Sequence, residues 1–139
     1  MDVSVIQHGL PQAEILREAA ARAQHFEKLR PVAGTVLQTT DGELGLQATL
    51  SQAAEVFNGQ EIPDQEMVMF LAERLDQSET ELRAALAALP PLGPADDADY
   101  RQAYLDLRLS LVNAVTRLHR LNAHLSHLQD IMDLFLRAD

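Results

Sequence analysis

The chain contains no cysteine and no tryptophan among its 139 residues, and only 4% of them are aromatic. The absence of cysteine excludes disulfide bonds, thiolate metal sites and a cysteine nucleophile, a pattern that fits the cytosol or a protein exported unfolded. With so few aromatic side chains, the apolar content of 47% is mostly leucine and alanine. Such a composition indicates a core built from helix–helix contacts.

Basic residues are also scarce. Eleven lysines and arginines face 21 acidic residues, which gives a formal net charge of -10. A chain with this charge is repelled by phosphate backbones and by anionic lipid surfaces, so we expect no nucleic-acid or membrane-surface binding. No apolar run is long enough to span a bilayer, and the first ten residues do not have the pattern of a cleaved signal peptide. We therefore expect no membrane insertion.

Proline and glycine clusters divide the chain into predicted helices. We expect helices over residues 12–30, ended by Pro31, and 44–57, with a loop between them. A third helix starts after Asp64, whose carboxylate can cap the first turn, and runs to about Leu89, where the sequence "PPLGP" stops it. The last helix is capped by Asp96 or Asp97 and reaches almost to the C-terminus.

The predicted fold is all-α and forms one helical domain over residues 1–139. Residues 1–62 supply two shorter, variable N-terminal helices and loops, and residues 63–139 form an antiparallel helical hairpin with a long C-terminal helix. The architecture therefore resembles a four-helix bundle.

Apolar residues in the two hairpin arms recur at alternating steps of three and four, which is typical of the contact line, or seam, of a coiled coil. At 1.5 Å per residue the first arm is about 39 Å long and the second about 60 Å. Because the first arm ends early, about 20 Å of the second arm's seam has no partner within the hairpin. We expect protein binding there, through Leu118, Leu121, Leu125, Leu128, Met132 and Phe135.

A second apolar stripe, formed by Leu105, Leu109 and Val112, lies on a face of the last helix away from the seam. Two interpretations remain open for these surfaces. Either the two N-terminal helices fold back and close a self-contained four-helix bundle, or partner subunits cover them.

The sequence offers no catalytic, cofactor-binding or metal-binding constellation. Of His119, His124 and His127, none falls on the seam, and only the last two share a helix face, without a carboxylate at the spacing of a di-iron motif. The stretch "TTDGELG" lacks the lysine of a phosphate-binding loop, and no serine lies in a nucleophile elbow. We expect no enzyme activity and no cofactor.

The stretch "LAERLDQSETELRAALAALPPLGPADDADYRQAYLDLRLSLVNAVTRLHRLNAHLSHLQDIMDLFLR" has a helix, a proline- and aspartate-rich break and then a long terminal helix. This order resembles the inner-rod and needle proteins of type III secretion systems. "LQDIMDLFLR" is similar to the end of needle subunits, and "AAARAQHFEKLR" resembles the phenylalanine-centred short helix in their poorly structured N-terminal portion. The stretch of residues 31–64 has no counterpart in that family.

The resemblance implies a non-enzymatic assembly component of a secretion apparatus, cytoplasmic before export and then part of the cell envelope or secreted. The alternative is a cytosolic export chaperone of the flagellar FlgN kind, because "RLHRLNAHLSHL" is similar to the leucine- and asparagine-rich segment of that family's last helix. The partners would be copies of the same chain, apparatus subunits or the end of a client protein.

The net charge leads to a first prediction. Because a charge of -10 repels other polyanions, the protein should not be retained on duplex DNA or on anionic phospholipid vesicles at physiological salt. Co-sedimentation and electrophoretic mobility assays check this, with a basic protein of similar size as the positive control. Saturable binding to either ligand would show that the electrostatic argument is wrong.

Overall fold

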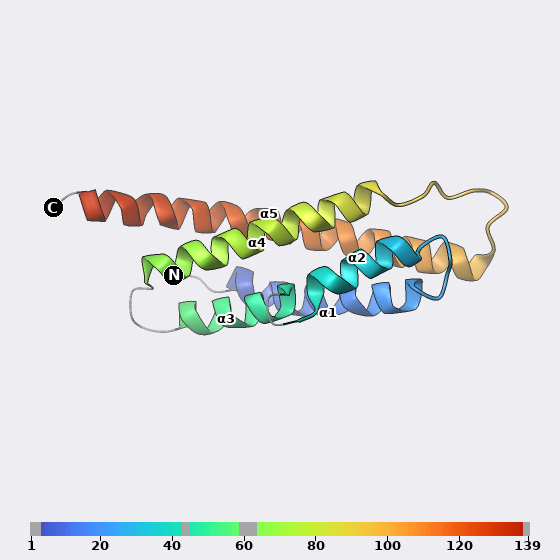
Figure 1. The fold of residues 1–139 in the computed structure, drawn as a ribbon, viewed down its shortest axis with the longest axis horizontal. Helices are drawn as coiled ribbons and strands as arrows, with labels where there is room; N and C mark the ends of the chain where they lie inside the picture. The colour runs from blue at the N-terminus through green and yellow to red at the C-terminus, as the bar shows by residue number, and fades with distance from the viewer. Residues whose placement is uncertain (1–3, 43–44, 59–63, 138–139) are drawn as a thin grey trace.

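A computed structural model describes residues 4–42, 45–58 and 64–137, and the helices among these residues are all α-helices (Figure 1). Their bounds are α1 Ser4–Ala23, α2 Arg30–Thr40, α3 Leu46–Asn58, α4 Gln65–Ala87 and α5 Ala98–Arg137. The predicted all-α class with a long C-terminal helix is confirmed. The described residues contain no strand.

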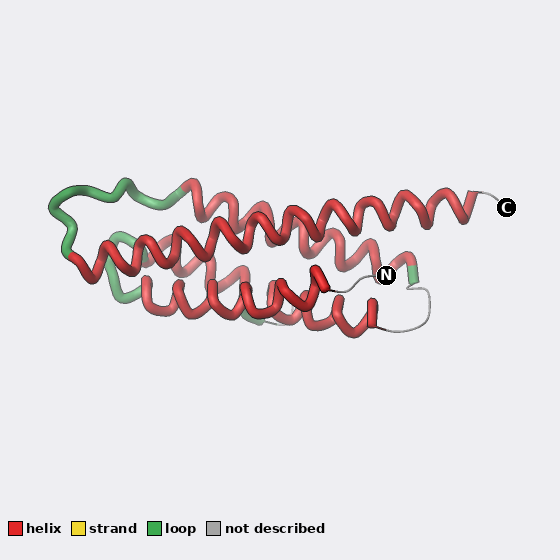
Figure 2. Tube along the Cα trace, turned by 180° about the vertical axis from the view of Figure 1, so that it is seen from behind, coloured by secondary structure: helices red, strands yellow, loops and turns green. Residues whose placement is uncertain are grey.

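The helices form an up-and-down bundle with four corners. α1 and α4 run in one direction, whereas α2, α3 and α5 run in the other, as both views show (Figures 1 and 2). α1 and α4 each pack against α5 on one side and against α2 and α3 on the other. The two short helices therefore follow one another along a single corner, diagonal to α5.

The corner formed by α2 and α3 corrects the predicted boundaries. Residues 12–30 were expected to form one helix that Pro31 ends, but α1 runs from Ser4 to Ala23 and Pro31 lies in the first turn of α2. Proline is well suited to that position, since its missing N–H would have no partner in the helix. The expected loop after Pro31 is thus mostly helix, and α2 ends where the Asp41 N–H donates to the Leu37 carbonyl.

The breaks on either side of α4 follow the predicted capping chemistry. The Asp64 carboxylate accepts a hydrogen bond from the Glu66 backbone N–H at 3.4 Å. At the start of α5, Asp97 accepts from the Tyr100 N–H at 2.8 Å and is therefore the cap. Asp96 has a different role, because its carboxylate accepts from the Gly93 N–H at 2.8 Å and closes the connecting loop.

The core consists of leucine seams from α4 and α5 packed against small residues of α1. Leu75 and Leu82 of α4 and Leu107 and Leu111 of α5 are fully buried. α1 contributes mainly alanines, which allow close approach of its backbone; they are Ala13, Ala19, Ala20 and Ala23. At one end Phe26, in the turn after α1, packs edge-to-face on Tyr100 with ring centroids 5.8 Å apart.

The bundle also covers part of α5 that was expected to be uncovered. Leu118, Leu121 and Leu125 are buried within the monomer, so of the two open interpretations the closed bundle applies to these three residues. Their cover does not come from the hairpin alone, because Ala13 of α1 and Leu50 of α3 line a small cavity together with Leu118 and Leu121. The N-terminal helices therefore close the bundle over this part of the seam.

This burial predicts the response to a charge at position 125. Leu125→Asp places a carboxylate among apolar side chains with no partner, which costs several kcal/mol. We expect the melting temperature to fall by about 10 °C or more, or the protein not to fold. Ser126→Asp is the matched control, because Ser126 is exposed on the adjacent position of α5. Equal melting temperatures for the two variants in differential scanning calorimetry would contradict the closed bundle.

Candidate functional site

The predicted protein-binding residues divide into three environments along α5. Leu118, Leu121 and Leu125 belong to the core, as described above. Leu128 and Met132 are partly buried against that core. Phe135 is 73% exposed. Only the last three of the six residues thus remain available, in whole or in part, for contact with another molecule.

The C-terminal end of α5 projects beyond the ends of α3 and α4 (Figures 1 and 2). Its exposed apolar side chains are Phe135, Leu134 at 68% exposure and Ile131 at 36%. Exposed leucine and phenylalanine side chains grouped on one helical turn are typical of contact surfaces. We call Leu128, Met132 and Phe135, which continue the line of the seam, the terminal seam.

The second apolar stripe is exposed as well. Leu105, Leu109 and Val112 are 47%, 61% and 37% exposed, respectively. The N-terminal helices pack on the other side of α5 and leave this stripe uncovered. Leu109 is among the most exposed large apolar residues described.

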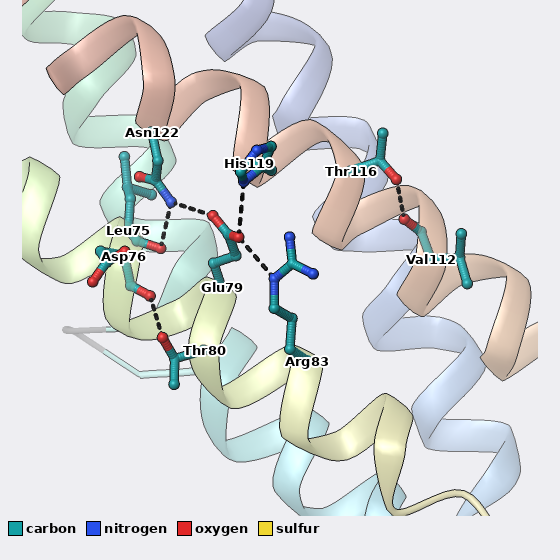
Figure 3. A network of polar contacts seen from close by, with 9 residues as sticks. All are labelled: Leu75, Asp76, Glu79, Thr80, Arg83, Val112, Thr116, His119 and Asn122. Atoms are coloured by element: carbon teal, nitrogen blue, oxygen red, sulfur yellow. Dashed lines mark hydrogen bonds and ion pairs between the residues drawn. The ribbon is translucent and has the colours of Figure 1, made fainter. Parts of the chain in front are cut away.

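Sequence reasoning missed a polar cluster between α4 and α5, drawn in Figure 3. Its centre is Glu79, which is buried although it is charged. Asn122 donates from Nδ2 to Glu79 Oε1 at 2.8 Å, and Arg83 donates from Nε to Oε2 at 2.8 Å. His119 Nδ1 lies 3.2 Å from the same Oε2, on an exposed imidazole. The Asn122 amide also donates to the Leu75 carbonyl at 3.3 Å.

Burial raises the pKa of Glu79, but the hydrogen bonds from Asn122, Arg83 and His119 outweigh it, so that its pKa lies below the usual range. Glu79 is therefore ionised at neutral pH. A carboxylate held in this form by three donors is a poor proton donor. What the cluster does well is to join α4 to α5 at a fixed register.

The remaining polar side chains suggest little chemistry. His124 and His127 are exposed on α5. Over the residues that the structure describes, no three histidine or acidic side chains gather as metal ligands would. An open groove of about 670 Å³ lies between α2 and α4, but polar groups on its wall bond one another, with Thr39 donating to Glu81 at 2.8 Å.

Comparison with known proteins adds no identification. The chain significantly matches no protein-family model, no curated protein and no solved structure. In the part of the chain that the structure describes, no helix has both the length and the hydropathy needed to cross a bilayer. The resemblance to secretion proteins therefore rests on the sequence features alone.

The lowered pKa of Glu79 leads to a prediction about pH. A group whose pKa is lower in the folded state stabilises the fold above its unfolded pKa of about 4.3, and this contribution disappears as the pH falls through the folded value. Glu79→Gln should therefore lower the free energy of unfolding by about 1–2 kcal/mol at pH 7. The difference from the wild type should be smaller at pH 3, below the unfolded pKa, than at pH 7.

Urea denaturation at both pH values measures the difference. Glu73→Gln is the control, because Glu73 is on the exposed face of the same helix and should change the stability little at either pH. If Glu79→Gln lowers the free energy of unfolding by the same amount at both pH values, the charge of Glu79 is not what stabilises the bundle.

Proposed function

We propose that this protein is a non-enzymatic, protein-binding component of a type III secretion or flagellar export pathway, and that it binds a helical segment of another protein at the terminal seam of α5. The observation that carries the proposal is the projecting end of α5: Gln65, the first residue of α4, still donates to Asp133 at 2.9 Å, and the seam then ends in the exposed Phe135. A partner helix can continue the bundle there by packing on Leu128, Met132 and Phe135.

The mode of binding follows from how the seam ends. Leu125 is fully covered, Leu128 and Met132 are half covered, and Phe135 is open. A partner helix that covers these positions would extend the same pattern of knobs into holes by about two turns. The gain comes from apolar area removed from water, and Phe135 contributes most because it is the largest exposed side chain of the three.

Of the two forms of this function, an export chaperone fits the bundle better than an inner-rod subunit. The rod resemblance implies a poorly structured N-terminal portion with a short helix around Phe26. Here α1, α2 and α3 are packed into the bundle, and Phe26 lies in a turn against Tyr100. A preformed bundle with one exposed apolar end is what holding the end of a client requires.

A photo-crosslinking experiment tests the proposal. A benzophenone amino acid at position 135, incorporated in the native host, should crosslink to a secreted protein or an apparatus subunit. The same amino acid at Gln24, exposed in the turn after α1, is the control and should not. With the captured partner purified, Phe135→Asp should weaken binding by about tenfold or more without lowering the melting temperature, because Phe135 is exposed in the monomer.

Two results would contradict the proposal. One is a crosslinking pattern that is the same from position 135 and from position 24. The other is a captured partner whose dissociation constant, measured by calorimetry, is unchanged in the Phe135→Asp variant.

A further inference from the structure

The face of α5 opposite the core carries a continuous line of exposed residues at steps of three and four, which we call the outer face. Its members are Leu105, Leu109, Val112, Thr116, Arg120, Ala123, His127, Ile131 and Leu134. Both ends of this line are apolar and its middle is polar or small. Over most of its length this line lies on a different side of α5 from the seam, but at the C-terminal end Ile131 is four residues from Phe135 and shares a face with it.

The charges along the outer face are unevenly distributed. Residues 107–129 include Arg108, Arg117 and Arg120 and no acidic residue, although Asp106 precedes them beside Leu105 and acidic residues outnumber basic ones 21 to 11 in the chain. The stretch that follows is acidic, with Asp130 and Asp133 beside Ile131 and Leu134. One helix therefore carries both a basic apolar patch and an acidic apolar patch.

We propose that two copies of this chain pair through the outer faces of α5, antiparallel and about a two-fold axis at residue 120. In this register Leu109 of one copy lies opposite Ile131 of the second copy, and Leu105 is level with Phe135 and next to Leu134. Each basic apolar patch then meets an acidic apolar patch, twice in the dimer. The contact extends over about 45 Å of helix, from position 105 to position 134.

The charges match at the edges of the contact as well as along its length. Arg108 and Asp130 are 22 residues apart, about six helical turns, so they lie on nearly the same edge of α5. In an antiparallel helix pair about a two-fold axis, equal edges face one another. Arg108 therefore comes next to the second copy's Asp130, and Asp130 next to the second copy's Arg108.

Other occupants fit this face less well. A parallel pair would bring the two basic stretches to the same level, and likewise the two acidic ends, which like-charge repulsion disfavours. A nucleic acid would meet the carboxylates of Asp130 and Asp133 at one end of the face, within a chain of net charge -10. In the antiparallel pair the two Arg120 side chains, one from each copy, meet at the axis. This like-charged contact identifies the register.

The absence of native cysteine allows a direct test of the register, because one introduced cysteine can crosslink only to another copy. Under mild oxidation Arg120→Cys should form a disulfide-linked dimer rapidly. Leu105→Cys alone should not, since its copy lies about 45 Å away. The double variant Leu105→Cys, Leu134→Cys should crosslink again. Crosslinking of Leu105→Cys alone at the rate of Arg120→Cys would overturn the antiparallel arrangement.

Sedimentation equilibrium on the unmodified chain tests the affinity. The wild type should form a dimer whose dissociation constant rises about tenfold or more in Leu105→Asp. Ile15→Asp is the matched control, because Ile15 on α1 has the same exposed fraction, 47%, and lies outside the outer face. Arg120→Leu should tighten the dimer by roughly tenfold, because it removes the like-charged pair at the axis.

Three results would overturn the proposal. The first is a wild type that stays monomeric up to about 200 μM, and the second is a dimer that Leu105→Asp and Ile15→Asp weaken equally. The third is binding of the wild type to duplex DNA at physiological salt that the Arg120→Glu variant loses. The proposal does not depend on the proposed function. Leu105→Asp and Arg120→Leu change the pairing surface and leave the terminal seam of the same chain intact, so failure of pairing is measured separately from failure of client binding.

Discussion

The burial of one apolar line on α5 is the constraint on which the rest of the fold depends. α5 is 40 residues long, and its seam is covered from Tyr100 to Leu125. No single neighbour extends over that length: α4 has 23 residues, and the opposite corner needs both α2 and α3. The bundle is closed because α1 packs along the second side of α5, where small alanine side chains permit close contact.

Much of this arrangement was predictable from the sequence, because the seams of α4 and α5 depend on local periodicity. Leu75, Leu82, Leu107 and Leu111 are buried as their spacing indicates, and Asp64 and Asp97 cap the helices that follow them. Caps and seams depend on residues a few positions apart, so a single sequence contains the necessary information. The break between α4 and α5 follows from its prolines in the same way.

The errors came from interactions that local patterns do not contain. Pro31 can end one helix or begin the next, and local spacing does not decide between them; in the fold it begins α2, and the turn before it packs Phe26 on Tyr100, 74 positions later. The covering of Leu118 and Leu121 depends on the return of α1 and α3, whose alanines carry little amphipathic signal. Glu79 was missed for the same reason, because its partner Asn122 is 43 residues away. The one local sign of it was a polar residue, Ser78, at the seam spacing between Leu75 and Leu82, with Glu79 next to it.

α5 therefore has one face that the bundle covers, one end where the seam runs on and an outer face that the bundle leaves open. The Glu79 cluster is important for the two uncovered surfaces of α5, the end of the seam and the outer face. It fixes α4 to the middle of α5 and so determines where the terminal seam begins. The two proposed contacts adjoin at the C-terminal end of α5, where Ile131 of the outer face is four residues from Phe135 of the terminal seam. An antiparallel pair would carry its two terminal seams at opposite ends, each level with Leu105 of the second copy. Each copy would then hold its client segment at the edge of the contact between the two copies.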